Sequence, residues 1–321
     1  MEKHNVYDLK QMQSLSLESK VAMSIRRIID WYEFYEGNVF VSISGGKDST
    51  VLAHLVKSIY PDVPLVFINT GLEYNSIRQK AEKEADITLF PKKSFAQVVT
   101  DYGYPVISKE ISLKVTRIQH KPDSAYLKYF DGSEKGKSNF DHSNYAWLLN
   151  APFRISHECC DKIKKNPAYD YAKKSNKKPF IGTLAEESFL RKKEWNKHGC
   201  NAFDKAHPSS QPLSFWTEQD ILKYIKINNL PLAEVYGEIE EENEIFSTTG
   251  ESRTGCVFCL FGIGADPQRF VRLKNNEPKK YDYIMRGGKF DETGMWIPDN
   301  GLGFKFVIDW LNENGNMHIQ Y

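Results

Sequence analysis

Short apolar runs and amphipathic segments take turns along the first part of the chain. Residues 1–37 are expected to form a helical lead-in, because Val21, Ile25 and Ile28 recur at helical spacing. The same patterns predict strands at 38–43, 63–69, 87–90 and 178–183, and helices at 49–60 and 76–85. Strands that alternate with helices in short units imply a parallel sheet covered on both faces. The fold class expected for about residues 38–190 is therefore α/β.

The later part of the chain follows this alternation less closely. Residues 121–144 are polar and rich in Gly, Ser and charge, so we expect an exposed insertion or lid there. Thr217 and Asp220 resemble a capping box at the start of a helix, with Asp in the usual Glu position. Beyond about residue 200 the alternation fades, which indicates a helical and irregular C-terminal region. The expected domains are a lead-in at 1–37, an α/β domain at 38–195 and a C-terminal region at 196–321.

Composition and charge narrow the classes of protein that fit. The chain has 321 residues, of which 40% are hydrophobic and 13% aromatic, which excludes a disordered or fibrous chain. Its 43 Lys and Arg against 42 Asp and Glu leave a net charge of +1. A global basic coat for nucleic acid is thus not evident, although a local basic patch stays open. The sequence shows neither an apolar run near the roughly 18 residues of a membrane span nor the apolar stretch of a signal peptide. Cytoplasmic residence without a membrane partner is therefore expected.

A glycine-containing loop follows the strand predicted at 38–43. It consists of Ser44, Gly45, Gly46, Lys47, Asp48 and Ser49. Glycines let a backbone approach an anion closely, and the amides at a helix N-terminus supply donors and a favourable dipole. Lys47 adds a mobile positive charge, and Ser44 and Ser49 add hydroxyl donors. Since the GxxxxGK[ST] pattern of the nucleoside triphosphate P-loop is absent, we expect a phosphate site of another type rather than a plain Gly-Gly turn.

The five cysteines indicate a metal centre rather than disulfides. Cys159 and Cys160 are adjacent, Cys256 and Cys259 form a CxxC, and Cys200 stands alone. Four thiolates are able to bind zinc or an iron–sulfur cluster. Adjacent cysteines reach one small ion poorly because successive side chains diverge, whereas a cube of irons offers each thiolate its own iron. A [4Fe–4S] cluster is thus favoured, with structural zinc and buried structural thiols as alternatives.

Several segments of the sequence resemble a known family. The loop SGGKDS resembles the pyrophosphate loop (PP-loop) of the N-type ATP pyrophosphatases, the adenine-nucleotide alpha-hydrolase superfamily. Further matches are similar to the phosphoadenosine phosphosulfate (PAPS) reductase family: INTGLEYNSIRQ at 68–79, GTLAEESFLRKK at 182–193 and QPLSFWTEQDILKYIKINNLPLAEVY at 211–236. Asn69 stands where that family commonly has Asp. The resemblance covers about residues 38–265 and implies a Rossmann-like parallel sheet flanked by helices.

The resemblance also implies a nucleotide site. The loop residues from Ser44 to Ser49 would hold the phosphates of an adenine nucleotide, and Thr70, Gly71 and Glu73 would lie near the same pocket. Arg191, Lys192 and Lys193 are either anion contacts or a solvated helix start, and the family's Glu-Ser…Arg segment favours contacts.

A second set of roles concerns the cysteines. Iron–sulfur reductases of the family carry a similar Cys-Cys…Cys-x-x-Cys set, which implies a [4Fe–4S] cluster. Its ligands would be Cys159, Cys160, Cys256 and Cys259. Lys162 and Arg253 stand close to these cysteines in sequence and would offset the charge of the cluster.

The preferred interpretation is an ATP-dependent adenylating enzyme of sulfur metabolism. An intact SGGKDS loop suits cleavage of ATP between its α and β phosphates, since loop amides and Lys47 stabilise charge that develops on pyrophosphate. Such enzymes usually need Mg²⁺, for which Asp48 is a candidate ligand. The resemblance to DNA phosphorothioation sulfurtransferases and tRNA thiolases implies sulfur transfer to an adenylated nucleic acid or small molecule. The sulfur donor would be a cysteine desulfurase or a reductant protein. The candidate catalytic residues are Lys47, Asp48 and Cys200.

Two other functions compete with this interpretation. Sulfonucleotide reductases attack adenylyl sulfate or PAPS with a cysteine in a C-terminal Glu-Cys-Gly-x-x-His segment, but this chain has no cysteine after Cys259. A reductase would have to use Cys200, which stands beside His198 and several lysines that would lower the pKa of its thiol. Cys200 is otherwise an inert thiol. The other alternative is a catalytically idle nucleotide-binding regulatory protein.

Overall fold

The computed structural model describes residues 4–135 and 141–321, which form two compact units. The first unit consists of Met1–Asn69, Glu73–Phe90 and Asn166–Thr254. The second consists of Thr70–Leu72, Pro91–Lys165 and Gly255–Tyr321. Both units are discontinuous in sequence, whereas the sequence-based prediction divided the chain into three consecutive segments. The difference arises because the described residues between 91 and 165 contribute no strand to the sheet of the first unit and fold with the C-terminal residues instead.

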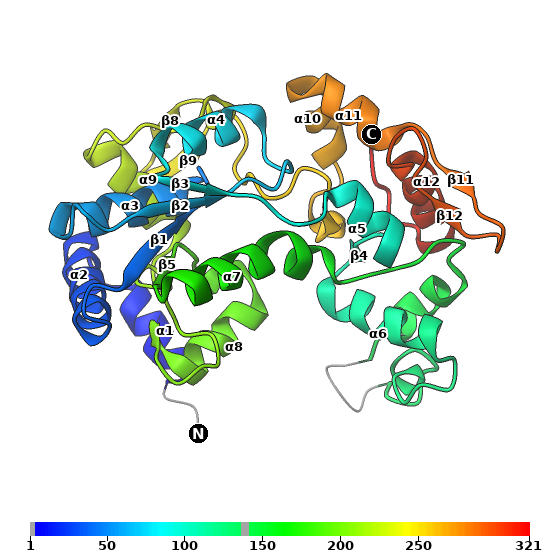
Figure 1. The fold of residues 1–321 in the computed structure, drawn as a ribbon, viewed down its shortest axis with the longest axis horizontal. Helices are drawn as coiled ribbons and strands as arrows, with labels where there is room; N and C mark the ends of the chain where they lie inside the picture. The colour runs from blue at the N-terminus through cyan, green and yellow to red at the C-terminus, as the bar shows by residue number, and fades with distance from the viewer. Residues whose placement is uncertain (1–3, 136–140) are drawn as a thin grey trace. The chain divides into compact units, whose positions relative to one another are not determined.

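A six-stranded sheet forms the centre of the first unit (Figure 1). Its strands are β1 (Val39–Ile43), β2 (Leu65–Ile68), β3 (Ile87–Leu89), β5 (Lys178–Ile181), β6 (Asn201–Ala202) and β7 (Ser209–Ser210). Their order is β3-β2-β1-β5-β7-β6, with parallel pairing except between β6 and β7. The four strands predicted from apolar runs are confirmed, each shortened by one or more residues at its ends. The expected α/β class is thereby confirmed as well.

The helices of the first unit pack against this sheet and against one another. They are α1 (Val6–Gln13), α2 (Leu17–Phe34), α3 (Lys47–Ile59), α4 (Asn75–Glu84), α7 (Asn166–Ser175), α8 (Phe189–His198) and α9 (Glu218–Ile227). The predicted lead-in is two helices, because Ser16 caps α2 by accepting a hydrogen bond from the amide of Ser19. The predicted capping box is confirmed, with Thr217 and Asp220 each accepting the other's backbone amide. An antiparallel hairpin of β8 (Ile239–Glu242) and β9 (Ile245–Thr248) completes the unit.

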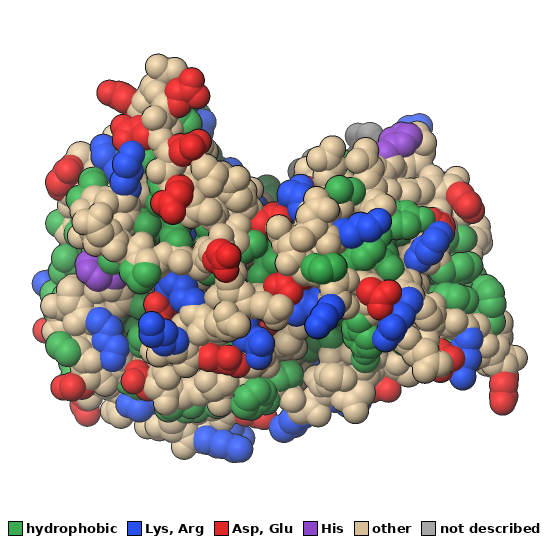
Figure 2. All heavy atoms as spheres, turned by 90° about the horizontal axis from the view of Figure 1, so that it is seen from above, with side chains coloured by type: hydrophobic (Ala, Val, Ile, Leu, Met, Phe, Trp, Pro, Cys, Tyr) green, Lys and Arg blue, Asp and Glu red, His purple; other side chains and the backbone are tan. Residues whose placement is uncertain are grey.

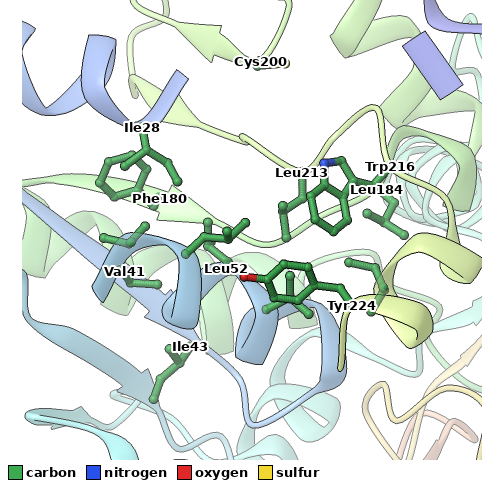
Figure 3. Packing of buried hydrophobic residues seen from close by; sticks show 14 of the residues in the cluster. Ile28, Val41, Ile43, Leu52, Phe180, Leu184, Cys200, Leu213, Trp216 and Tyr224 are labelled. Atoms are coloured by element: carbon green, nitrogen blue, oxygen red, sulfur yellow. The ribbon is translucent and has the colours of Figure 1, made fainter. Parts of the chain in front are cut away.

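Apolar side chains from α2, β1, α3, β5 and α9 meet in one buried core (Figure 3). Ile28, Val41, Leu52 and Phe180 are each fully buried there. Polar contacts fix α2 to the segment before α9: Ser24 Oγ donates to the carbonyl of Pro212 at 2.9 Å and accepts from Trp216 Nε1 at 2.9 Å. The sheet and its helices therefore form a rigid support for loops at the strand ends.

The second unit is mainly helical. Its helices are α5 (Phe95–Tyr102), α6 (Lys109–His120), α10 (Arg269–Asn276), α11 (Pro278–Met285) and α12 (Phe304–Gly315), and its strands are β4 (Val106–Ile107), β10 (Leu260–Phe261), β11 (Lys289–Phe290) and β12 (Trp296–Ile297). Strands β4 and β10 pair in parallel, so a segment near residue 106 lies beside one near residue 260. Tyr104 is buried and its hydroxyl donates to the carbonyl of Leu302 at 2.8 Å. The helical C-terminal region expected from the sequence is thus observed from about residue 255 onward rather than from residue 196.

Three surface features complete the description. Within the predicted insertion at 121–144, residues 136–140 lie outside the described residues, and most of the others are exposed. Every helix among the described residues is too short or too polar to cross a bilayer. On the face seen in Figure 2, acidic and basic side chains are interspersed, in keeping with the net charge of +1.

Candidate functional site

The strand order of the first unit reverses at β1. Strand β1 pairs with β2 on one side and with β5 on the other, so the chain leaves these neighbouring strands in opposite directions. In open parallel sheets, ligands bind outside the carboxyl ends of the strands at such a reversal. The loop SGGKDS follows β1, and the segment GTLAEE follows β5. Two segments that resemble the family therefore meet at the edge of the sheet where a ligand is expected.

The loop is held in shape by its own hydroxyl groups and by a glycine in a special conformation. Ser49 Oγ accepts the amide of Ser44 at 3.1 Å and donates to the carbonyl of Gly46 at 2.9 Å. Gly45 has φ +75°, and a Cβ there would lie 2.4 Å from the carbonyl oxygen of Ile77. A side chain at this position is excluded by both the backbone conformation and the close approach of α4. The loop leads directly into α3, which begins at Lys47. The backbone amides of the loop therefore adjoin the N-terminal amides of this helix, which are the donors that an anion needs.

Lys47 is almost buried, with 6% of the residue exposed. Its Nζ donates to a carboxylate oxygen of Glu218 and to the carbonyl of Ser252, the latter at 2.8 Å. Its backbone amide donates to the hydroxyl of Tyr236 at 3.3 Å, and that hydroxyl lies 2.6 Å from Thr254 Oγ1. Burial raises the pKa of Tyr236 to about 12, so its hydroxyl keeps its proton at neutral pH. Because Lys47 Nζ is already paired with Glu218, a phosphate oxygen that binds Lys47 would have to replace this carboxylate.

Asp48 provides a buried carboxylate in the first turn of α3. Its Oδ1 is enclosed by protein and has no hydrogen-bond partner among the described residues. Burial raises the pKa of this carboxyl, Glu218 reinforces the shift, and Lys47, Arg253 and Arg191 oppose it. An enclosed carboxylate oxygen without a partner has an obvious chemical use as a ligand for a cation such as Mg²⁺.

Two arginines of the first unit converge on a carboxylate that follows β5. Glu187 forms ion pairs with Arg191 and with Arg253, the latter at 2.5 Å. The positive charges of both arginines act on Asp48, so they lie near the loop. Arg191, Lys192 and Lys193 are all exposed on α8, and of these three Arg191 pairs with Glu187, so anion contacts by these residues stay a prediction. Arg253 was expected to offset cluster charge, but it is paired with Glu187 in the first unit.

The remaining predicted nucleotide residues are divided between the two units. Glu73 belongs to the first unit and is buried. Thr70 and Gly71 belong to the second, where the hydroxyl of Thr70 accepts the amide of Leu72 at 3.1 Å. Their roles near the loop stay predictions.

The second unit brings the four predicted ligand cysteines to one pocket. Cys159, Cys160, Cys256 and Cys259 line it together with Leu72, Phe95, Pro105, Ile163 and Lys164. Cys160 Sγ lies 4.0 Å from Cys159 Sγ, and the carbonyl of Cys256 accepts the amide of Cys259 at 3.1 Å. In the described part of the chain, no three His, Cys, Asp or Glu side chains form a group suited to a single metal ion. Two cysteine pairs that are distant in sequence thus lie at one pocket.

Basic groups and amides surround these thiols. A hydrogen bond from Cys159, with help from Lys109 and Lys164, lowers the pKa of Cys160 to about 6, whereas burial raises that of Cys259 to about 12. Cys259 Sγ accepts the amide of Phe261 at 3.4 Å. The predicted cation Lys162 instead pairs with Glu158 and lies over the ring of Tyr102.

Two cations near the cysteines were missed from the sequence. Arg269 donates to the carbonyl of Cys259 at 2.7 Å, and the charge of Lys109 acts on Cys160. Sequence distance concealed both of them. The π-helical segment Asp161–Lys165 directly after Cys160 is a further local signal, because such segments are frequent at functional sites.

Cys200 lies in the hydrophobic core of the first unit (Figure 3). It is only 6% exposed, and its Sγ accepts a hydrogen bond from Ser214 Oγ at 3.4 Å. The neighbouring His198 is directed to Asp204 at 3.0 Å. This environment favours the interpretation of Cys200 as an inert buried thiol over that of a nucleophile, because a nucleophile must reach its substrate.

Three side chains that contact Lys47 or the nearby arginines were not singled out from the sequence. Glu218, Tyr236 and Glu187 all contact Lys47 or the arginines around it. Each lies inside a segment that resembles the family, at 182–193 or 211–236. The resemblance therefore pointed to these segments but did not indicate what the three residues contact.

Comparisons with known proteins identify the family of this chain. Residues 38–110 and 109–260 match the phosphoadenosine phosphosulfate reductase domain family. An adenosine 5′-phosphosulfate reductase of Staphylococcus epidermidis is 26% identical over 238 residues, which cover 72% of this chain and 74% of that protein. An uncharacterized protein of Methanocaldococcus jannaschii is 25% identical over 289 residues, 87% of this chain and 56% of that protein. Sulfate adenylyltransferase subunit 2 of Rhizobium etli is 23% identical over 201 residues, 60% of this chain and 55% of that protein.

The chain thus spans only about half the length of the last two relatives. The family match, in contrast, extends over more than half of this chain and includes both the loop and the four pocket cysteines. The protein therefore belongs to the phosphoadenosine phosphosulfate reductase domain family.

Proposed function

We propose that the protein is an ATP-dependent adenylating enzyme that carries a [4Fe–4S] cluster and transfers sulfur to an adenylated acceptor such as a nucleic acid. The observation that carries this proposal is the SGGKDS loop, which follows β1 at the strand-order reversal and places Lys47 and Asp48 in the first turn of α3. The names of two relatives refer to adenosine 5′-phosphosulfate and to adenylyl transfer, which supports an adenine nucleotide as ligand.

The loop is suited to releasing pyrophosphate. An acceptor oxygen attacks the α-phosphorus of ATP, a new oxygen–phosphorus bond forms, and the bond from the α-phosphorus to the bridging oxygen breaks. Lys47 exchanges Glu218 for the β- and γ-phosphates and neutralises the charge that the leaving pyrophosphate gains. The amides at the start of α3 add the favourable end of a helix dipole.

Asp48 fits a role in holding Mg²⁺. Its enclosed Oδ1 has no partner among the described residues, and a cation would supply one. Mg²⁺ is commonly held by one or two carboxylates together with substrate phosphates, so a dedicated group of three protein ligands is not needed.

The cysteine pocket fits an iron–sulfur cluster. Cys159, Cys160, Cys256 and Cys259 would hold it, one thiolate to each iron. The surrounding apolar side chains exclude water, and the Phe261 amide and nearby basic side chains balance thiolate charge. When bound, such a cluster supplies electron-transfer chemistry.

Pyrophosphate release is the decisive measurement. We expect anaerobically purified protein to release pyrophosphate from ATP and to adenylate the acceptor when candidate acceptors are supplied. AMP should appear as well once a sulfur donor is added, because its sulfur displaces AMP from the adenylated acceptor. Sulfite produced from adenylyl sulfate or PAPS with thioredoxin, and absent with Cys200→Ser, would instead identify a reductase. ATP binding without turnover against any acceptor would identify a regulatory nucleotide-binding protein.

A further inference from the structure

The first turn of α8 exposes apolar side chains where a soluble helix normally buries them. Phe189 is 75% exposed and Leu190 is 56% exposed, and both stand at the helix start. On the inner face of the same helix, Trp195 is buried and stacks on His4 with ring centroids 4.7 Å apart. The exposed pair is therefore not needed for packing this helix, and contiguous exposed apolar groups commonly mark an interaction site.

Positive charge accompanies the exposed aromatic ring. The helix carries Arg191, Lys192, Lys193 and Lys197 against the single acid Glu194, which pairs with Lys205 at 2.6 Å. Phe189, Lys193 and Lys197 follow one another at intervals of four residues, so they share one helix face. Lys192, Lys193 and Lys197 are exposed. A chain with a net charge of +1 thus concentrates cations beside an exposed ring.

This surface begins next to the nucleotide loop. Ser188 caps α8, and Glu187 before it pairs with Arg191 and Arg253. The charges of both arginines act on Asp48 in the first turn of α3. A ligand on the helix start is therefore close to the position where the α-phosphate of ATP is proposed to react.

We propose that Phe189, Leu190, Lys192, Lys193 and Lys197, here named the α8 surface, bind the acceptor and that this acceptor is a single-stranded nucleic acid. A base stacks on the ring of Phe189, and the lysines contact the phosphates that flank it. A single strand is required because the base must leave its own stack to reach the ring. The inference rests on the proposed function, since it names the acceptor of that reaction.

Binding of a fluorescein-labelled oligonucleotide to the full chain tests the α8 surface without any need for turnover. Anisotropy is followed with a mixed-sequence single strand, as DNA and as RNA, and with the matching duplex. We expect the single strand to bind more tightly than the duplex, and Phe189→Ala to weaken its binding about tenfold, as is typical when one stacked base loses its aromatic partner. Lys192→Gln with Lys193→Gln should lower the slope of log affinity against log salt by about 0.7 for each phosphate that is no longer neutralised.

Matched controls come from exposed residues elsewhere in the first unit. Phe90 is 68% exposed, and Lys223 is exposed on α9, so Phe90→Ala and Lys223→Gln change the same residue types outside the α8 surface. Equal affinity of Phe189→Ala and Phe90→Ala, or no saturable binding by the wild type, would overturn the inference. Thermal unfolding followed by circular dichroism should give equal midpoints for the four variants, because none of the replaced side chains is buried.

Pyrophosphate release by the wild type is measured separately. If the variants weaken oligonucleotide binding as expected but the wild type cleaves no ATP, the result supports the α8 surface as a binding site and contradicts the adenylating function. ATP cleavage with a small-molecule acceptor and without oligonucleotide binding would do the reverse. Whichever of DNA and RNA binds more tightly then names the acceptor.

Discussion

The nucleotide loop of the first unit and the cysteine pocket of the second concentrate chemistry in different ways. The loop is contiguous in sequence and is completed by charged neighbours: Lys47 is nearly buried against Glu218, and Asp48 has an enclosed oxygen without a partner among the described residues. The pocket joins two cysteine pairs separated by 95 residues and is lined mainly by sulfur and apolar groups. The loop is thus suited to reversible binding of an anion, at Lys47, and of a cation, at Asp48. The pocket resembles a site for a resident group, since its thiols converge among apolar side chains.

The largest expected effect concerns Lys47. Lys47→Ala should lower pyrophosphate release by about 10²–10³-fold, because this variant lacks the buried charge that we propose as the stabiliser of the leaving group. Lys57→Ala on the same helix is the control, since Lys57 lies at the far end of α3 and donates to the carbonyl of Pro61. Turnover of Lys47→Ala at the rate of Lys57→Ala would remove the loop from the mechanism.

The cysteine pocket is tested by iron rather than by turnover. Cys256→Ser should lose most of the iron and acid-labile sulfide, whereas Cys200→Ser should retain wild-type amounts because Cys200 is buried in the other unit. Anaerobically purified wild type should carry about four irons per chain by metal analysis. One zinc per chain without sulfide would refute the cluster.

Glycines sharpen the comparison between the two units. Gly45 and Gly294 both have positive φ, +75° and +81°, but of these two only Gly45 has a neighbouring backbone atom that a Cβ would meet, 2.4 Å away. Gly294→Ala should cost about 1 kcal/mol of unfolding free energy from backbone strain, and Gly45→Ala about 1–3 kcal/mol more. Urea unfolding measures the loss of unfolding free energy in both variants. Equal losses would show that α4 moves away from residue 45 at little energetic cost.

The smallest effect is the pH dependence of stability at Asp48. Because the pKa of Asp48 is raised in the folded protein, the wild type loses stability as pH rises from about 4, the unfolded value, through the folded pKa. Asp48→Asn should therefore have a higher melting temperature than the wild type at neutral pH, and this advantage should vanish below about pH 4. Asp62→Asn, at an exposed position, is the control. A pH-independent difference would show that Asp48 carries no buried charge.

If Asp48→Asn is more stable and also inactive, the two units differ in a further respect. The first unit would then keep an unfavourable charge in place for the sake of its reaction, which is common at functional sites. The four thiols of the second unit would be stabilised by the group that they bind.

Local pattern determined a large part of this protein. The strands β1, β2, β3 and β5, the helix start at Thr217 and the family resemblance follow from short segments, because strand burial, capping and a phosphate loop depend on neighbouring residues. The cysteine set was also evident, since a CC and a CxxC are local patterns.

Tertiary structure decided the partners of these residues. Glu218 reaches Lys47 across 171 positions and Arg253 pairs with Glu187 across 66, and no periodicity encodes such distances. Residues 91–165 fold with the C-terminal segment because β4 pairs with β10, a choice that apolar runs in either strand leave open. Cys200 stands in a basic stretch, yet packing directs its side chain into the core. Local sequence patterns therefore indicated which residues are candidates for chemistry, and long-range packing determined which charges and thiols face one another.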